Sequence, residues 1–242
     1  MDKVIGFAIA LCEEAYRLFG KGGWVDSSGF LTKVERTRGH VVWVVITGPG
    51  KDRSIRGTEH LLATSPHAVF NLGVAGALDN SLSNGDLLCP KRLISDRGFV
   101  DLETSFKTDT DKIISSCKSG IKKGSLYTSR YVLSSPQEKS AILSRTGAMA
   151  VDMEAFFIAQ KCEEKGVEFY ACKAISDEAQ EAIPKVISKS VTEKGGVNMV
   201  HLLAGILFRP WLVKRLISLN REFKKAMFSL ELAKSAIIAG CL

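Results

Sequence analysis

Short apolar runs bounded by Gly, Pro or Asn recur along the whole chain, and stretches of helical character separate them. Several runs are rich in Val and Ile without polar alternation, which is typical of strands buried on both faces of a sheet. The predicted strands are Lys3–Ala10, His40–Thr47, Ala68–Leu72, Gly85–Cys89, Leu126–Val132, Ala148–Met153 and Phe169–Ile175. The predicted helices are Asp52–Ala63, Ser135–Ser144 and Glu154–Lys165. Such alternation predicts an α/β fold whose mostly parallel sheet is covered by helices.

Local signals mark the ends of two predicted helices. Ser135-Pro-Gln-Glu138 is a capping box with Pro at the first helical position, and Gly166 follows Lys165 as a typical helix C-terminus. The sequence contains no internal repeat, low-complexity segment or Pro-rich linker. Because 242 residues lie within the range of one α/β domain, we expect residues 1–242 to form a single domain.

Composition places the chain among globular proteins and argues against nucleic acid as a partner. Apolar residues make up 45% of the sequence and charged residues 24%, which excludes a disordered tail or a disulfide-rich scaffold. Lys and Arg number 33 against 26 for Asp and Glu, yet no basic run indicates nucleic-acid binding. The six cysteines lack a Cys-x-x-Cys pair and no secretory signal is recognised, so we expect reduced thiols and a cytoplasmic protein. The four histidines are scattered, and no metal site is predicted.

The C-terminal segment 197–242 differs from the rest of the chain. Val197–Phe208 carries no charged residue, but twelve residues are too few for a membrane span, which needs roughly 20. One interpretation is a C-terminal helix buried on the sheet. The others are an apolar lid, or an interfacial helix whose Trp211, Lys214 and Arg215 make peripheral contact with lipid headgroups. The sequence leaves these interpretations open.

Acidic side chains follow three of the predicted strands, at the sheet edge where ligands bind in open α/β folds. Glu14 comes after the first strand, whereas Glu154 and Asp177 come after two later ones. A carboxylic acid can protonate a leaving base, a second carboxylate can bind ribose hydroxyls, and a third can orient water toward the anomeric carbon. Together they suit cleavage of a glycosidic bond. Taken singly, Glu154 is also explained as a helix N-terminal acid and Asp177 as an N-cap.

Three segments resemble motifs of the nucleoside phosphorylase/nucleosidase superfamily. They are Asn71-Leu-Gly-Val-Ala-Gly-Ala-Leu78, Val151-Asp-Met-Glu-Ala155 and Ala174-Ile-Ser-Asp177. The resemblance runs in order from residue 3 to about residue 180. It implies a single-domain, three-layer α/β/α fold with a central mixed β-sheet, and a homodimer or higher homo-oligomer that binds a small nucleoside.

Within this superfamily, the methylthioadenosine/S-adenosylhomocysteine nucleosidases provide a role for each matching residue. The resemblance implies that Asp177, assisted by Ser176, protonates N7 of adenine. It further implies that Glu154 binds the ribose hydroxyls, that Met153 packs on the sugar and that Glu14 orients the attacking water. Asp177 would have to be protonated near neutral pH, a state that partial burial favours.

The same resemblance implies the walls of the pocket. The backbone of Ala75 and Gly76 would form its floor, because glycine-rich chain lets backbone amides approach a sugar or a planar base. Main-chain groups around Val132 and Leu133 would read the base edge. Two departures argue against methylthioadenosine as the substrate: Val74 stands where a serine is common, and Val132 where an adenine-stacking aromatic residue is common.

Hydrolysis is predicted over phosphorolysis. Hexameric phosphorylases carry a Gly-Asp-Pro-x-Arg loop after the first strand and an Arg before the Gly-rich strand end, whereas this chain has Ala10-Leu-Cys-Glu-Glu14 and Asn71. A phosphate dianion would therefore lack its bidentate arginine partners. Arg53, Arg56 or Arg130 could still supply a cation, and phosphate would then be a co-substrate. No metal or redox cofactor is expected.

A nearer resemblance is to the hopanoid-associated branch, which is proposed to remove adenine from adenosylhopane. It rests on residues 128–139 and 146–154 and on Arg209-Pro210. A triterpene at the 5′ position needs a broad apolar surface, which 197–217 would provide, and burial contributes about 25 cal/mol per Å². The alternatives are a methylthioadenosine/S-adenosylhomocysteine nucleosidase, a phosphate-dependent purine nucleoside phosphorylase, and a nucleoside- or lipid-binding protein without turnover.

Overall fold

The structure is a computed structural model that describes residues 3–37, 39–105, 121–184, 195 and 212–240. Its strands are β1 (Lys3–Ile9), β2 (Val25–Ser27), β3 (Phe30–Thr37), β4 (His40–Ile46), β5 (Ala68–Ala77), β6 (Leu87–Ser95), β7 (Gly98–Asp101), β8 (Ile121–Thr128), β9 (Ala150–Asp152) and β10 (Glu168–Asp177). Its helices are α1 (Cys12–Phe19), α2 (Lys51–Leu62), α3 (Leu102–Ser105), α5 (Pro136–Thr146), α6 (Ala155–Lys165) and α9 (Leu212–Gly240). The predicted α/β fold with a mixed central sheet is confirmed.

The sheet runs in the order β10-β6-β8-β9-β5-β1-β4-β3-β2, and β7 pairs with β6. β1 lies between β4 and β5 and is parallel to both, which explains its uninterrupted apolar sequence. β5 also pairs with β10 along its whole length and with β9 at its end. These pairings close β5, β10, β6, β8 and β9 into a ring, and the ring gathers several strand ends at one place.

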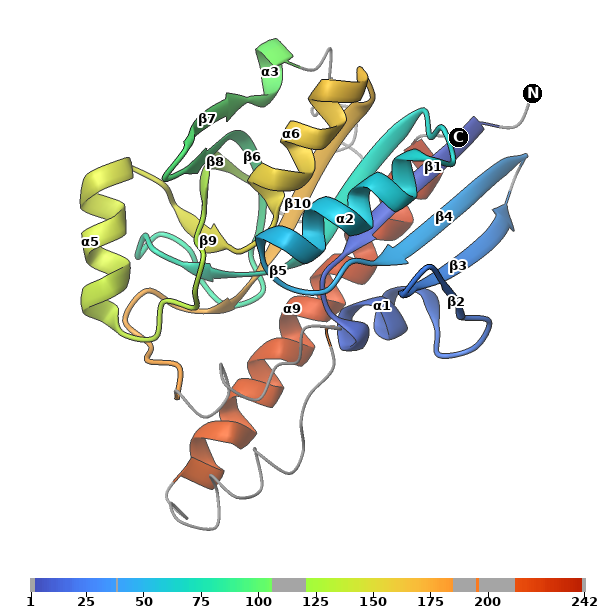
Figure 1. The fold of residues 1–242 in the computed structure, drawn as a ribbon. Coiled ribbons are helices and arrows are strands. Elements are labelled where there is room, and N and C mark those ends of the chain that lie inside the picture. Colours follow the sequence, from blue (N-terminus) through green and yellow to red (C-terminus); the bar gives the residue numbers. More distant parts are fainter. Residues whose placement is uncertain (1–2, 38, 106–120, 185–194, 196–211, 241–242) are drawn as a thin grey trace.

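Helices cover both faces of the sheet (Figure 1). On one face, α2 and α6 pack against the sheet through Leu61, Phe156 and neighbouring residues of one hydrophobic core. On the other face, α1 and α9 contribute Leu18 and Met227 to a second core. The two cores on opposite faces give the three-layer arrangement that the sequence predicted.

The predicted elements are present, with changed boundaries and several additions. β5 continues past Leu72 to Ala77, because Gly73 and Gly76 stay extended and pair with β10. The predicted strand Leu126–Val132 ends at Thr128, since the chain turns away there and Ser129 closes a turn with Tyr131. The predicted strand Gly85–Cys89 begins at Leu87 and extends to Ser95. Sequence analysis did not predict α1, the β2–β3 hairpin or β7.

The α5 capping box forms as predicted. The Ser135 hydroxyl accepts a hydrogen bond from the Glu138 amide, and Glu138 Oε2 accepts one from the Ser135 amide. Pro136 occupies the first helical position, and Gly147 ends the helix in the left-handed conformation. The capping box therefore fixes where α5 begins.

The C-terminal helix α9 lies along β10 and β5 (Figure 1). Ala226, Met227, Leu230, Ala233 and Ile237 are buried against the second core, so this part of the segment covers the sheet. Arg215, one of the three residues considered for lipid contact, forms ion pairs with Glu181 and Glu222. The apolar run at 197–208, Arg209-Pro210 and Trp211 lie outside the described residues, and the Lys214 side chain is not described.

Among the described helices, none combines the length and the apolar character that a membrane crossing requires.

Candidate active site

A pocket of about 450 Å³ opens where β5, β9 and β10 end. Its lining brings together segments that are far apart in the sequence: the start of α1, the turn before α2, the loop after β8, and the last residues of three strands. The lining residues are Ala10, Leu11, Glu14, Pro49, Gly50, Val74, Ala75, Gly76, Arg130, Tyr131, Val132, Leu133, Val151, Asp152, Met153, Glu154, Ser176, Asp177 and Ile183.

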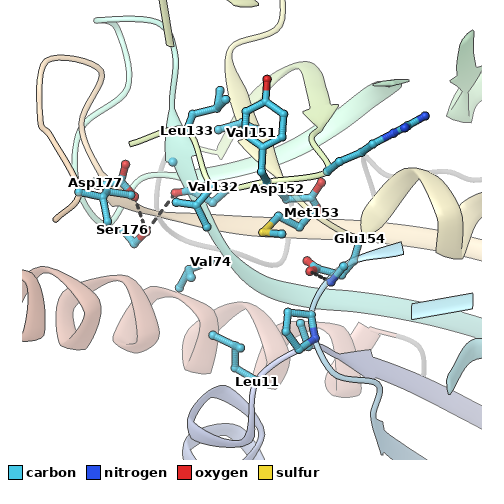
Figure 2. A pocket seen from close by; sticks show the side chains of 18 of the residues that line it. Leu11, Val74, Val132, Leu133, Val151, Asp152, Met153, Glu154, Ser176 and Asp177 are labelled. Carbon is cyan, nitrogen blue, oxygen red and sulfur yellow. Dashed lines mark hydrogen bonds between the residues drawn. The ribbon is translucent and has the colours of Figure 1, made fainter. Parts of the chain in front are cut away.

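Figure 2 shows a pocket with polar ends and an apolar middle. Asp177 and Ser176 lie at one end, and Glu154 lies at the other. Val74, Val132 and Met153 stand between them. A ligand that fills this space would therefore meet carboxylates at both ends and apolar side chains along its length.

Glu14 is a buried residue of the pocket lining and links α1 to β5. Its Oε2 accepts a hydrogen bond from the Leu11 amide at 3.0 Å, and its Oε1 accepts one from the Val74 amide at 2.8 Å. Burial raises the pKa of Glu14, against the opposing effect of the Val74 and Leu11 amides and of the Lys173 charge. A carboxylate made more basic in this way is suited to taking a proton from water.

Glu154 precedes α6 and contacts the turn before α2 at one end of the pocket. Its Oε1 accepts a hydrogen bond from the Gly50 amide at 2.8 Å. Burial, reinforced by the nearby charge of Asp152, raises the pKa of Glu154 to about 7. Glu154 occupies the N-cap position of α6, but its side chain makes no cap hydrogen bond. Asp152 instead provides a hydrogen bond at the start of α6, because its Oδ2 accepts from the Ala155 amide at 2.9 Å.

Lys173 and Asp152 form a buried ion pair of 3.0 Å beside Glu14 and Glu154. Asp152 also accepts a hydrogen bond from the Thr128 hydroxyl at 2.7 Å. Burial alone would lower the pKa of Lys173, but the charges of Asp152, Glu154 and Glu14 raise it. One ammonium group thus contacts Asp152 and lies near enough to Glu154 and Glu14 for their charges to raise its pKa.

Asp177 ends β10 and faces α5. Its Oδ2 accepts a hydrogen bond from Lys139 Nζ at 2.6 Å, and both side chains are almost fully buried. Its Oδ1 accepts one from the Ser176 hydroxyl at 2.8 Å. Sequence analysis expected Asp177 to be partly buried and did not anticipate Lys139 as its buried partner.

The glycines of β5 make room for two of these carboxylates. A Cβ at Gly73 would lie 3.1 Å from Glu14 Oε1, and one at Gly76 would lie 2.9 Å from Asp177 Oδ2. Sequence analysis assigned the glycines to close approach of backbone amides to a ligand. In the structure their small size also lets two acidic side chains lie against the strand.

The loop after β8 forms the wall between the two ends. Val132 is half-buried and Leu133 is buried, whereas Tyr131 is exposed at the pocket lining. The Ser129 hydroxyl closes the loop by donating to the Tyr131 carbonyl at 2.7 Å. The wall is aliphatic at Val132, where sequence analysis expected an aliphatic contact.

The three arginines considered as phosphate partners lie in different places. Arg53 donates to the carbonyls of Thr47 and Gly29 and stacks over the Phe30 ring. Arg56 is exposed on α2, where it donates to the Asp52 carbonyl. Arg130 lines the pocket with an exposed side chain.

All nine residues that sequence analysis selected for the site line this pocket. They are Glu14, Ala75, Gly76, Val132, Leu133, Met153, Glu154, Ser176 and Asp177. Sequence analysis missed Lys139 and Lys173 as buried partners of the acids. A signal existed for Lys173, because it is the one charged residue inside the apolar run Phe169–Ile175. Within the described ranges, no group of His, Cys, Asp and Glu side chains is arranged to hold a metal ion.

Comparisons with known proteins agree with this architecture. The family model described as the phosphorylase superfamily matches residues 12–206. A 5′-methylthioadenosine/S-adenosylhomocysteine nucleosidase of Staphylococcus haemolyticus is 30% identical over 159 residues, and the match covers 55% of this chain and 68% of that protein.

Solved structures resemble almost the whole chain. A mutant of the Helicobacter pylori methylthioadenosine/S-adenosylhomocysteine nucleosidase, with 5′-methylthioadenosine in its active site, has a TM-score of 0.76 at 20% identity and covers 99% of this chain and 100% of its own. The futalosine hydrolase of Helicobacter pylori has a TM-score of 0.74 at 18% identity, covering 98% of this chain and 97% of its own. At these identities the solved structures support the fold.

Proposed function

Because the chain belongs to the phosphorylase superfamily and resembles nucleosidases within it, we propose that it hydrolyses the N-glycosidic bond of a 5′-modified adenosine and releases adenine. The observation that carries this proposal is the set of three buried carboxylates, Glu14, Glu154 and Asp177, around one largely apolar pocket. Binding alone does not require so many buried acids, because each carboxylate is costly to desolvate.

The three acids divide the reaction between the ends of the pocket. Asp177 gives a proton to N7 of the purine while the C1′–N9 bond breaks and its electrons pass to the base. Water adds to C1′, and its proton passes to Glu14, whose raised pKa makes it a suitable base. Glu154 accepts hydrogen bonds from the ribose hydroxyls and holds the sugar between the two. Met153 packs on the sugar, and the main chain around Val132 and Leu133 contacts the base.

The charge of the pocket supports water as the nucleophile. Glu14, Asp152 and Glu154 line the end opposite Asp177, and the ammonium of Lys173 is committed to Asp152 at 3.0 Å. A phosphate dianion placed there would meet like charges, whereas a neutral water would not. Arg130 is the observation that favours the alternative, a phosphorylase, because it is an arginine on the pocket lining.

The apolar lining supports a hydrophobic 5′ substituent. Leu11 and Val74 line the pocket together with Val132 and Met153. We extend the proposal to a long hydrocarbon chain at the 5′ position, as in adenosylhopane, for which each 100 Å² of apolar surface buried would contribute about 2.5 kcal/mol.

Adenine release tests the proposal directly. The substrates are 5′-methylthioadenosine and an adenosine that carries a long 5′ alkyl chain, each with and without phosphate. Release that is independent of phosphate supports a nucleosidase, and a preference for the alkyl substrate supports the hydrocarbon substituent. Release only with phosphate, together with ribose 1-phosphate as product, would establish the phosphorylase instead. Calorimetric binding of both nucleosides without base release would contradict the enzyme and support a binding protein.

A further inference from the structure

Lys139 is a buried lysine whose ammonium group is fully engaged. Its side chain is 1% exposed, although it stands near the start of α5, a helix with several exposed residues. Nζ donates to Asp177 Oδ2 at 2.6 Å, to the Glu178 carbonyl at 2.7 Å and to the Glu181 carbonyl at 3.1 Å. An ammonium has three donors and no acceptor, so these contacts satisfy it completely.

This arrangement fixes Asp177 from two directions. Lys139 holds Oδ2 from α5, and the capping box at Ser135 fixes the first turn of that helix. The two carbonyls bound by Lys139 belong to the chain that follows Asp177, so the same ammonium also anchors the segment carrying the acid. The side chain of Asp177 cannot turn away from the pocket without breaking these contacts.

The hydroxyl of Ser176 allows both charge states of Asp177. Its oxygen lies 2.8 Å from Asp177 Oδ1 and 3.3 Å from the carbonyl oxygen of Ala75. Because a hydroxyl has one proton, it donates to Oδ1 when Asp177 is ionised. When Oδ1 carries a proton, that proton can point to Ser176, whose own proton then turns to Ala75.

We infer that Lys139 is a positioning residue for base release: it orients the Asp177 carboxyl group and stabilises the carboxylate that forms when Asp177 gives its proton to the leaving base. This inference rests on the proposed function. The proton moves from Asp177 to N7, the C1′–N9 electrons pass into the purine, and Lys139 keeps its three protons throughout. Negative charge develops on Asp177 next to an ammonium already in place, so no reorganisation is needed at that moment.

The other charged groups near Asp177 have partners of their own in the described part of the chain. Glu181 pairs with Arg215 of α9, and the Glu178 side chain accepts from the Asn84 amide. Asp152 pairs with Lys173, and Arg130 is exposed at the pocket lining. Lys139 is therefore the group whose removal should change the acidity of Asp177 most.

The test compares Lys139→Gln, which removes the charge, with Lys139→Arg, which keeps it, by measuring kcat of adenine release as a function of pH. In Lys139→Gln we expect the alkaline limb, where the acid loses its proton, to move up by about one to three pH units. The highest kcat should fall about tenfold, because a weaker acid transfers its proton less readily. Lys139→Arg should keep the limb near its original position, and Lys161→Met, a change on the outer face of α6, should leave the whole profile unchanged.

A purely structural lysine would give a different result. Its loss would lower stability or kcat without moving the alkaline limb, and such an outcome overturns the inference. The charge of Asp177 is measured separately, by carboxyl ¹³C NMR with Asp177→Asn to identify the signal. We expect the carboxyl signal of Asp177 to titrate at a higher pH in Lys139→Gln than in the wild-type protein.

The two measurements separate the inference from the proposed function. If the wild-type protein releases no base from any nucleoside, the proposed function fails, and with it the catalytic part of the inference. The NMR titration would then still decide whether Lys139 controls the charge of Asp177. If Lys139→Gln does not fold, the wild-type protein still tests the inference: the ¹⁵N signal of Lys139 Nζ should shift as Asp177 titrates and should stay constant in Asp177→Asn, and a Lys139 signal that does not respond to Asp177 overturns the inference.

Discussion

The two ends of the pocket neutralise their carboxylates in different ways. At one end, Asp177 has an ammonium of its own, Lys139, at 2.6 Å. At the other end, Glu14 and Glu154 accept hydrogen bonds from backbone amides, and the ammonium of Lys173 contacts Asp152 instead. Burial raises the pKa of both glutamates, that of Glu154 to about 7.

In the proposed reaction, this difference lets carboxyl groups serve opposite tasks at the two ends. A carboxyl group that must give up a proton benefits from a cation that stabilises the resulting charge, as Lys139 does for Asp177. A carboxyl group that must accept a proton or a hydroxyl hydrogen bond benefits from an excess of negative charge, which makes it more basic. The number of carboxylates around each buried lysine, one at Lys139 and three at Lys173, therefore distinguishes the two ends.

Asp177→Asn should have the largest effect on the reaction. The amide keeps the shape of the side chain but has no acidic proton, so kcat of base release should fall by about 10²–10⁴-fold, the usual range for a positioned acid. KM and the thermal midpoint should change little, since the amide oxygen of the variant can still accept from Lys139. The matched control is Glu178→Gln, a change at the exposed neighbouring acid. Near-normal kcat in Asp177→Asn would show that Asp177 is not the general acid. The contrast between the two ends of the pocket would then have no catalytic role.

Glu14→Gln should have the second largest effect on the reaction, lowering kcat about 10²-fold. The amide oxygen can still accept a hydrogen bond from a backbone amide or from water, but it cannot take up the proton of the attacking water. Glu13→Gln provides the control, because Glu13 is the adjacent residue and its side chain is exposed. Steady-state adenine release by both variants makes the measurement. Equal losses in the two variants would mean that the effect arises from α1 in general and not from the buried carboxylate.

The fold was largely predictable from the sequence, because its signals are local. Buried parallel strands such as β1 appear as uninterrupted apolar runs, and the Ser135 capping box marks the start of α5. What could not be predicted depends on pairing between distant segments. Nothing local indicates that β5 pairs with β10 and β9 as well as β1, and this pairing carries the strand past Gly73 to Ala77.

The acids of the site were predictable and their buried cationic partners were not. Glu14, Glu154 and Asp177 match residues of a known family, so the resemblance to that family points to them. The partner of Asp177 comes from α5, where Lys139 follows the capping Glu138 and has the sequence pattern of a solvated surface lysine. Its burial is a consequence of how α5 lies against the end of β10. The contact between Lys139 and Asp177 could therefore not be predicted from the sequence.

Two glycine substitutions test the two ends of the pocket independently. In Gly76→Ala the new Cβ would lie 2.9 Å from Asp177 Oδ2, and in Gly73→Ala it would lie 3.1 Å from Glu14 Oε1. Neither glycine has a positive φ, so the backbone accepts alanine and the carboxylate must move instead. We expect kcat losses on the order of tenfold for a displacement of a few tenths of an ångström. The pH profile should change in Gly76→Ala, where the contact with Lys139 is disturbed, and should keep its alkaline limb in Gly73→Ala. An unchanged kcat in both would show that the carboxylates tolerate displacement and that their placement is not critical.

Glu154→Gln should have the smallest effect on the rate and the clearest effect on pH dependence. With a pKa of about 7, Glu154 becomes ionised as pH rises through neutrality, and the ionised form accepts both ribose hydroxyls better than the protonated one. The KM of the wild-type protein should therefore fall several-fold on going from pH 6 to pH 8, by roughly the factor that one weakened hydrogen bond to a charged group provides. Glu154→Gln should show a flat KM over this interval, and Glu163→Gln, a change at an exposed acid of the same helix, should behave like the wild type.

The pH dependence of stability tests the raised pKa of Glu154 independently of substrate binding. A raised pKa means that the folded state holds the proton more tightly, so the wild type loses stability as pH rises from 4.5 to about 7. Glu154→Gln should thus unfold at higher denaturant concentration than the wild type above neutral pH and lose that advantage in acid. If instead Glu154→Gln is less stable than the wild type above neutral pH, then Lys173 neutralises Glu154 as fully as Lys139 neutralises Asp177, and the two ends of the pocket are electrostatically alike.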